Sequence, residues 1–292
     1  MNKDVLVIGG SGFLGSHVCD FLHKKGYRVR ILDLKKSFYL NEDYHFIKGD
    51  MLDFDTLEKA IKGCIYVYNF GGIADLNQAL TRPIDTVKVN VLGNVQVLDL
   101  CVKYKVERYI YSSTIYVNSR EGSFYRCSKI ACEEYIEEYS KSYGLNYTIL
   151  RYGSLYGERS DESNGLYRLV NNAIKNSKVS YIGNVNTKRE YINVKDAASL
   201  SVEILSKKHI NEHIIITGLE KIGVKDLLHM LNEILGLKDE VEFEDKKYLG
   251  HYVRTPYAYK QKLIKKIIPN SYIDFGQGLY DLIYSLKKNS CE

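Results

Sequence analysis

The segment Val5-Leu6-Val7-Ile8-Gly9-Gly10-Ser11-Gly12-Phe13-Leu14-Gly15 joins a short apolar run to three glycines spaced by three residues. The apolar run predicts a buried strand, the glycines predict a tight turn, and residues 16–25 predict a helix. Glycines let the backbone approach a ligand closely, and the free N–H groups at the start of a helix attract an anion. We therefore expect the first unit of a parallel α/β sheet, with a pyrophosphate site at Gly9, Gly12 and Gly15.

A glycine turn also closes ordinary strand–helix connections, so a second feature is needed to identify the ligand. Asp33 provides it, because it follows the next apolar run, residues 29–32, about twenty residues after the glycines. A carboxylate at this place hydrogen-bonds the adenosine ribose of NAD and repels the 2′-phosphate of NADP. Lys35 and Lys36 argue the other way, since a cation would attract that phosphate. The sequence predicts NAD, with Asp33 and Lys35 beside it.

Length and composition exclude several classes of protein. The chain has 292 residues and a formal net charge of +5, enough for a full core and a smaller second lobe. Its basic residues form no stripe with interleaved aromatics, so nucleic acid is not expected as a partner. Residues 1–4 lead directly into the first strand, and no apolar run reaches the length of a membrane span. We expect a cytoplasmic protein with neither a signal peptide nor a membrane partner.

The six cysteines indicate neither a disulfide framework nor a metal site. They lie at positions 19, 64, 101, 127, 132 and 291, mostly within apolar patterns, and no Cys-x-x-Cys pair occurs. Histidines do not cluster at the spacing of metal ligands. We expect reduced, mostly buried thiols and no metal.

The order of predicted strands and helices indicates the architecture. Strands are predicted at 29–32, 44–48, 65–70, 108–113 and 147–151, and helices at 55–62, 84–104 and 124–143. Their alternation predicts a doubly wound parallel sheet with right-handed crossovers. Ligands of such sheets bind at the carboxyl ends of the strands. Five loops are predicted at that edge: Gly9 to Gly15, Asp33, Asp50-Met51, Phe70-Gly71-Gly72 and Ser112-Ser113-Thr114.

Tyr125 and Lys129 are candidates for the chemistry at this edge. They are four residues apart in the helix predicted for 124–143, so they share one face. A tyrosine with a pKa near ~10 is a poor base at neutral pH. A neighbouring cation and the positive nicotinamide ring would stabilise the phenolate and lower that pKa. Thr114 follows a strand and could hold a substrate oxygen, although elsewhere it would be only a turn cap.

These residues resemble those of the extended short-chain dehydrogenases/reductases, in the NAD-dependent epimerase/dehydratase family that acts on nucleotide sugars. The resemblance covers nearly the whole chain. It includes the glycine loop, residues 49–53 and 69–72, Asn90 with Gly93, Ser112 to Thr114, Tyr125 with Lys129, and residues 150–157 and 189–196. It implies a modified Rossmann fold with a smaller C-terminal substrate-binding lobe.

The resemblance also implies roles for individual residues. The catalytic residues would be Thr114, Tyr125 and Lys129. The cofactor would meet Gly9, Gly12, Phe13, Leu14, Gly15, Asp33, Lys35, Asp50, Met51, Phe70, Gly71, Gly72, Asn90, Ser112, Tyr125, Lys129 and Tyr152. The substrate would meet Thr114, Ser154, Arg189 and Arg254, with the two arginines on its diphosphate. The helices at 84–104 and 125–143 would form a two-fold homodimer.

The sequence departs from the family pattern around the sugar pocket. Ser154 replaces the usual asparagine, which puts one substrate contact in doubt. Tyr125 follows Thr114 by only eleven positions, fewer than usual, which implies a more open pocket. Ile115 and Tyr116 stand where dehydratases and decarboxylases have carboxylates. Elimination of water and loss of carbon dioxide therefore have no obvious agent, although a glutamate of the later lobe, such as Glu158 or Glu162, could substitute.

We therefore predict an NAD-dependent nucleotide-sugar epimerase that oxidises a hydroxyl, at C4, through a keto intermediate. A 4-dehydrogenase or 4-ketoreductase of the same family is the alternative. A non-catalytic NAD(P) sensor is a third hypothesis, disfavoured because such sensors usually lose the residues at 114, 125 and 129. The predicted cofactor domain spans 1–157 with a returning segment at about 184–220, and the substrate lobe spans 158–183 and 221–292.

Overall fold

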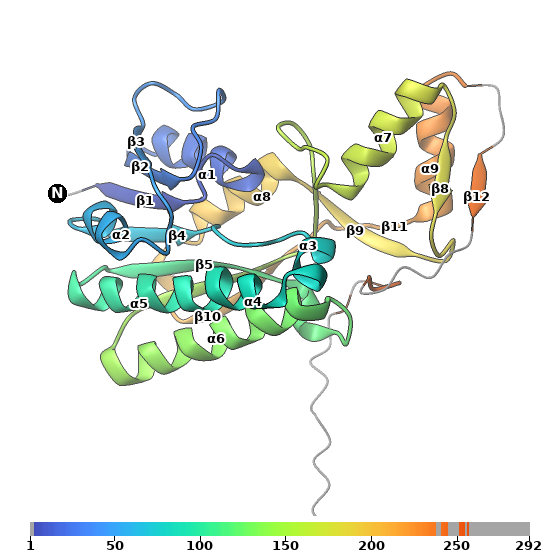
Figure 1. The fold of residues 1–292 in the computed structure, drawn as a ribbon. Helices are drawn as coiled ribbons and strands as arrows, with labels where there is room; N and C mark the ends of the chain where they lie inside the picture. The colour runs from blue at the N-terminus through green and yellow to red at the C-terminus, as the bar shows by residue number, and fades with distance from the viewer. Residues whose placement is uncertain (1–2, 238–240, 245–250, 255, 257–292) are drawn as a thin grey trace, which may run out of the picture. The chain divides into compact units, whose positions relative to one another are not determined.

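The central element of the computed structural model is a parallel sheet of seven strands (Figure 1). The structure describes residues 3–237, 241–244, 251–254 and 256. The strand order is β10-β6-β5-β4-β1-β2-β3, and every neighbouring pair is parallel. The strands are β1 Asp4–Ile8, β2 Arg28–Asp33, β3 His45–Lys48, β4 Tyr66–Asn69, β5 Arg108–Thr114, β6 Tyr147–Tyr152 and β10 Glu212–Ile216. The predicted doubly wound parallel sheet is confirmed.

Helices cover both faces of this sheet because alternate strand residues point to opposite sides. Leu6 and Ile8 of β1 belong to one apolar cluster, with side chains of α2 (Phe54–Ile61), α5 (Gly93–Lys103) and α6 (Ser123–Tyr143). Val5 and Val7 belong to a second cluster, with α1 (Phe13–Lys24) and α8 (Val194–Glu203). Figure 1 shows α5 and α6 on one side of the sheet and α1 and α8 on the other.

The helix predicted at 84–104 differs from expectation in its first half. A short helix, α4 (Pro83–Thr86), leads into a wider π-helical turn, η1 (Val87–Leu92), before α5 begins. The widened turn contains Asn90, whose side chain bonds the loop after β4 and also α6. π-helical turns of this kind occur frequently at functional sites.

The rest of the described chain forms smaller units. The remaining helices and strands of the described residues are α3 (Leu76–Thr81), η2 (Ile115–Asn118), β7 (Ser154–Tyr156), α7 (Gly165–Asn176), β8 (Ser180–Ile182), β9 (Lys188–Asn193), η3 (Lys207–His209), β11 (Lys221–Gly223), α9 (Val224–Ile234) and β12 (Glu242–Glu244). Strands β11, β9 and β7 form one small sheet, and β12 pairs with β8. A third apolar cluster joins α7 to α9 through Ala173, Val224 and Leu228. Residues 257–292 of the predicted lobe lie outside the described residues, and the predicted division into two lobes stays a prediction.

Candidate active site

The glycine loop after β1 has the geometry that a dinucleotide requires. Gly9 has a φ of +75°, which favours glycine, and its N–H donates to the carbonyl of Leu32 over 2.9 Å. A Cβ on Gly15 would lie 2.3 Å from the carbonyl oxygen of Gly9, so only glycine fits there. Helix α1 begins at Phe13 with no side-chain cap on its N–H groups. These groups are available to a pyrophosphate, and the loop therefore fits NAD.

Asp33 lies at the end of β2, beside this loop. Its Oδ2 accepts from the N–H of Ser11 over 3.0 Å, and its Oδ1 lies 3.4 Å from the N–H of Lys35. These backbone contacts orient the carboxylate at the edge where a ribose would bind. Asp50 instead caps its own turn, accepting from the N–H of Leu52 over 2.9 Å. Met51 is buried beneath the loop after β4.

A cavity of about 1240 Å³ extends from the glycine loop to the residues of the small sheets. Twelve of the predicted site residues line it: Gly9, Gly12, Phe13, Leu14, Gly15, Phe70, Ser112, Thr114, Tyr125, Tyr152, Ser154 and Arg189. The other predicted residues are outside its lining: Asp33, Lys35, Asp50, Met51, Gly71, Gly72, Asn90, Lys129 and Arg254. The edge predicted from the sequence is therefore the edge at which the cavity opens.

Thr114 and Tyr125 meet at the wall of this cavity, and Lys129 lies buried behind them. The side chains of Thr114 and Tyr125 are neighbours, close enough for the Thr114 hydroxyl to lower the pKa of Tyr125. Lys129 is buried, and its Nζ donates to the carbonyl of Ser112 over 2.6 Å. The same Nζ lies 5.7 Å from the centre of the Tyr125 ring and 4.7 Å from that of Tyr111. The predicted trio is thus assembled from β5 and the first two turns of α6.

Burial opposes the charged forms of both Tyr125 and Lys129. It raises the pKa of Tyr125 to about 12, although the Thr114 hydroxyl lowers it. It lowers the pKa of Lys129 to about 8. An additional positive charge in the cavity would favour the tyrosinate, because opposite charges in a buried site stabilise each other. The chain therefore holds a tyrosine that can serve as a base once a cationic ring is bound beside it.

Asn90 links the loop after β4 to the helix that carries Tyr125. Its Oδ1 accepts from the N–H of Ile73 over 2.7 Å, and its Nδ2 donates to the carbonyl of Ile73 over 3.0 Å. Its Nδ2 also donates to Ser128 Oγ over 2.9 Å, and that hydroxyl donates to the carbonyl of Tyr125 over 2.8 Å. A Cβ on Gly72 would lie 2.7 Å from Asn90 Oδ1. Asn90 therefore positions other residues, and direct contact with a cofactor stays a prediction.

Arg189 lines the same cavity, where aromatic residues surround it. Its guanidinium carbon is 4.9 Å from the centre of the Tyr252 ring, and its side chain lies beside Tyr116, whose pKa it lowers against the larger effect of burial. The Tyr116 hydroxyl lies 3.2 Å from Nδ1 of His251, and the Tyr252 hydroxyl lies 3.2 Å from Ser154 Oγ. Burial, reinforced by Arg189, lowers the pKa of His251 to about 4. At neutral pH the positive charge of this cluster therefore belongs to the arginine.

Of the two arginines that the sequence predicts for a diphosphate, only Arg189 lines the cavity. Arg254 is exposed, and it pairs through its backbone with Lys188 at the start of β9. Its role in substrate binding stays a prediction.

Tyr152 lines the cavity, but its hydroxyl lies 2.6 Å from Ser201 Oγ, in the direction of α8. The Tyr152 hydroxyl is therefore bonded to helix α8, and the rest of the side chain lines the cavity.

Sequence reasoning missed the aromatic residues around Arg189. Tyr116 could have been identified, because it lies two residues after Thr114, but the sequence analysis uses it only as a position that lacks the carboxylate of dehydratases. His251 and Tyr252 had none, since they reach the site only because the chain returns beside β9. The N–H of Lys188 donates to the carbonyl of Val253 over 2.8 Å at this place.

Two further findings concern the described part of the chain. Within it, no group of three or more His, Cys, Asp or Glu side chains could hold a metal ion, and its cysteines are free. No described helix has the length and apolarity needed to cross a membrane. The predicted cytoplasmic location stays a prediction.

Comparisons with known proteins give the same picture as this geometry. Residues 5–217 match the model of the NAD dependent epimerase/dehydratase family. A putative UDP-glucose 4-epimerase of Methanocaldococcus jannaschii is 27% identical, over 98% of this chain and 99% of that protein. The UDP-glucose 4-epimerase of Thermotoga maritima, solved with UDP-glucose, is 26% identical with a TM-score of 0.81, over 88% of this chain and 90% of that one. The Thermus thermophilus UDP-glucose 4-epimerase, solved with NAD, is 27% identical with a TM-score of 0.78, over the same shares.

These matches confirm the predicted family, and with it the predicted cofactor, NAD. The chain belongs to the NAD dependent epimerase/dehydratase family, and is an NAD-dependent enzyme of the extended short-chain dehydrogenase/reductase type.

Proposed function

We propose that this enzyme is a nucleotide-sugar epimerase, which oxidises a sugar hydroxyl at C4 to a ketone and reduces the ketone from its other face. The observation that carries the proposal is the contact between Thr114 and Tyr125 at the cavity wall, with Lys129 behind them. The 4-epimerases among the relatives and structural neighbours support C4 as the reacting carbon.

Tyr125 is the base of the first step and the acid of the last. Its phenolate oxygen takes the proton of the sugar hydroxyl as the C–H bond at C4 breaks, and it returns a proton to the oxygen when the ketone is reduced. NAD, when bound, supplies the acceptor of the hydride and then its donor. The proton and the hydride both return to the sugar, so the reaction consumes no co-reactant.

Thr114 and Lys129 make this proton transfer possible. The hydroxyl of Thr114 lies beside the Tyr125 side chain, so a sugar oxygen between them can be held by both. The Lys129 ammonium lies 5.7 Å from the ring and stabilises the phenolate, and its bond to Ser112 holds it there. Lys129 would also hold the nicotinamide ribose when NAD is bound.

The substrate diphosphate is bound by Arg189. A guanidinium donates two parallel hydrogen bonds to phosphate oxygens, and the Tyr252 ring holds its plane. Ser154, paired with the Tyr252 hydroxyl, is the second polar contact for the nucleotide sugar. The cofactor is held by the glycine loop and Asp33, with Phe70, Ser112 and Tyr152 along the cavity.

A panel of nucleotide sugars tests the proposal. Incubation with NAD and catalytic amounts of enzyme, followed by proton NMR, should show two C4 epimers approaching equilibrium without net NADH. Accumulation of stoichiometric NADH at 340 nm would make the enzyme a 4-dehydrogenase. A product lighter by one water or one carbon dioxide would contradict the proposed chemistry.

We also propose that the enzyme is a homodimer. Helices α4 and α6 and the turn η1 expose large apolar side chains, among them Ile84, Val87, Leu92 and Tyr135. Exposed apolar groups clustered on neighbouring helices are typical of a protein interface. Light scattering at micromolar concentration should give twice the mass of the chain, and a monomer would contradict this proposal.

A further inference from the structure

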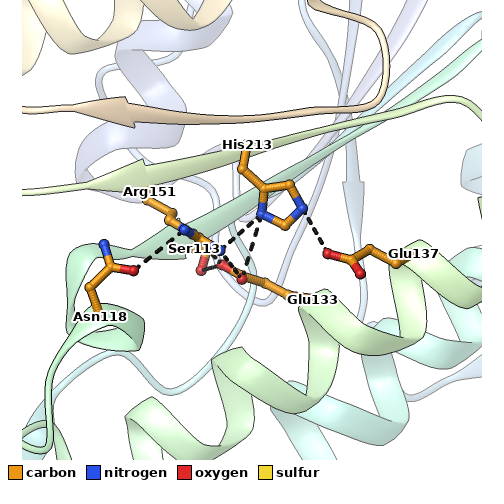
Figure 2. A network of polar contacts seen from close by, with 6 residues as sticks. All are labelled: Ser113, Asn118, Glu133, Glu137, Arg151 and His213. Carbon is orange, nitrogen blue, oxygen red and sulfur yellow. Dashed lines mark hydrogen bonds and ion pairs between the residues drawn. The ribbon is translucent and has the colours of Figure 1, made fainter. Parts of the chain in front are cut away.

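Glu133 is a buried carboxylate on the same face of α6 as the catalytic pair. Tyr125, Lys129 and Glu133 follow one another at intervals of four residues, so they form one row along the helix. Only 6% of Glu133 is exposed to solvent. Figure 2 shows that its carboxylate faces Ser113 of β5 and Arg151 of β6.

Both oxygens of this carboxylate are engaged. Oε1 accepts from Ser113 Oγ over 2.5 Å and from Arg151 Nε over 3.1 Å. Oε2 accepts from Arg151 Nη2 over 2.7 Å. The two arginine contacts make a bidentate pair, which has a more defined geometry than a single bond. The third contact ties the pair to the strand that carries Thr114.

His213 of β10 extends this group of contacts. Its Nδ1 lies 3.0 Å from Arg151 Nη2, and its Nε2 lies 2.8 Å from a carboxylate oxygen of Glu137 (Figure 2). An arginine can only donate, so Nδ1 accepts and the proton is on Nε2, which donates to Glu137. Arg151 Nη1 lies 3.4 Å from Asn118 Oδ1, at the end of η2.

The contacts of α6 with β5 occur at consecutive residues. Lys129 bonds the carbonyl of Ser112, and one helical turn later Glu133 bonds the hydroxyl of Ser113. The next residue of the strand is Thr114, whose side chain neighbours that of Tyr125. The contacts of Lys129 and Glu133 together fix the position of α6 along β5. This position determines the distance between the side chains of Tyr125 and Thr114.

We propose that Glu133 is a positioning residue of the reaction: held by Arg151, it anchors α6 to Ser113 and thereby aligns Tyr125 with Thr114. The inference rests on the proposed function of that pair. Misplacing a reacting group by ~1 Å through a change outside the chemistry can cost ~100-fold in rate. Loss of the anchor should therefore lower kcat, while KM for the nucleotide sugar, set at the Arg189 end of the cavity, stays unchanged.

The charge of Glu133 also acts on Lys129. Burial is the largest influence on the pKa of Lys129 and lowers it, while the negative charge of Glu133 acts in the opposite direction. The other titratable groups facing this region are Glu137 on α6, Tyr111 on β5, Tyr147 and Arg151 on β6, and His213 on β10. Neutralising Glu133 removes a negative charge near the ammonium, and the pKa of Lys129 then falls. The alkaline limb of the kcat profile, at which Lys129 loses its proton, should move to lower pH.

The first test is Glu133→Gln, which keeps the shape and removes the charge. We expect kcat to fall by ~10- to 100-fold with KM and the NAD dissociation constant unchanged, and the alkaline limb to move to lower pH. Amide hydrogen exchange with NAD bound should become faster at 123–129, the start of α6. Unchanged kcat, pH profile and exchange would overturn the proposal.

A second variant separates positioning from stability, because an unpaired Arg151 could unfold the protein. The double variant Glu133→Met with Arg151→Met removes both charges, an exchange that is often neutral or stabilising for buried pairs. We expect a wild-type melting temperature and an unshifted pH profile, yet the same loss of kcat, because Ser113 has lost its acceptor. Recovery of wild-type kcat together with stability would show that the pair is only structural.

Asp4→Asn is the matched control. Asp4 is a buried carboxylate that pairs with Arg28 and Arg30 at the opposite, amino-terminal end of its strand. Its loss should lower the melting temperature and leave kcat and the pH profile unchanged, and a fall in kcat equal to that of Glu133→Gln would overturn the positioning role. The wild-type enzyme tests the proposed function separately. If the wild-type enzyme has no epimerase activity, the proposed function is wrong. The anchoring role of Glu133 is then tested by hydrogen exchange alone, and faster exchange at 123–129 in Glu133→Gln would support it.

Discussion

Replacing Arg189 with alanine should weaken binding of the nucleotide sugar and leave NAD binding intact. Arg189 is half-buried. Burial has the largest effect on its pKa, and the side chains that act most strongly on that pKa are four tyrosines and no carboxylate. Its guanidinium is therefore available for an anion in the cavity. Charge-assisted hydrogen bonds contribute about 1.5–3 kcal/mol each, so losing one corresponds to about 10- to 150-fold in the dissociation constant.

Calorimetric titration with the nucleotide sugar, in the presence of NAD, measures this change directly. Arg189→Lys should lie between wild type and Arg189→Ala, because an ammonium keeps the charge but loses the two parallel bonds. Arg254→Ala is the control, since that residue is exposed and does not line the cavity. Equal substrate affinity for Arg189→Ala and wild type would refute the reasoning, and a large loss for Arg254→Ala would move the diphosphate site to the other arginine.

The remaining predictions concern the base, the cofactor and pH. Tyr125→Phe should abolish turnover while NAD still binds, as measured by fluorescence titration, because only the proton acceptor is lost. Asp33→Ser should bring the affinity for NADP up toward that for NAD, since the carboxylate no longer repels a 2′-phosphate; tighter NADP binding by the wild type would contradict the role of Asp33. Burial lowers the pKa of Lys129 to about 8 from 10.5, so over that pH range the unfolded chain carries a proton that the folded chain has lost. The free energy of unfolding of the wild type, relative to Lys129→Met, should therefore rise from pH 8 toward pH 10, and thermal melts that show no such rise would contradict it.

The sequence predicted the central sheet because its signals are local. The glycine loop, the apolar runs and Asp33 each encode their own turn or strand, and parallel strands bring their carboxyl ends to one edge. Tyr125 and Lys129 were identifiable because four residues of helix separate them. For such residues, distance along the chain translates directly into distance in space.

The rest of the site depends on contacts that cross the chain. Tyr252 reaches Arg189 only because residues 251–254 return beside β9. Asn90 was assigned to the cofactor, but a π-helical turn directs its side chain to Ile73 and Ser128. No periodicity in the sequence marks a widened turn or a pairing between residues 63 positions apart.

The cavity favours redox chemistry over elimination, and the positions of its carboxylates explain why. After Thr114 the chain places Ile115 in the core and Tyr116 beside Arg189, so neither position carries a carboxylate that could protonate a leaving hydroxyl. Glu158 pairs with Lys195 over 2.9 Å, and Glu162 bonds Asn171 over 2.8 Å.

Neither of these two glutamates lines the cavity, so neither substitutes for the missing acid. Three acidic residues do line it: Asp75 caps α3, Asp161 accepts from Ser163, and Glu121 lies exposed in the loop before α6, where its backbone bonds Ser119. A carboxylate committed to backbone N–H groups is a poor proton donor, because those bonds stabilise its charged form. Tyr125 lies beside Thr114, and its one exchangeable proton suffices for oxidation and its reversal. Loss of water would need a second acid, and Glu121 is the lining carboxylate that is not committed in this way.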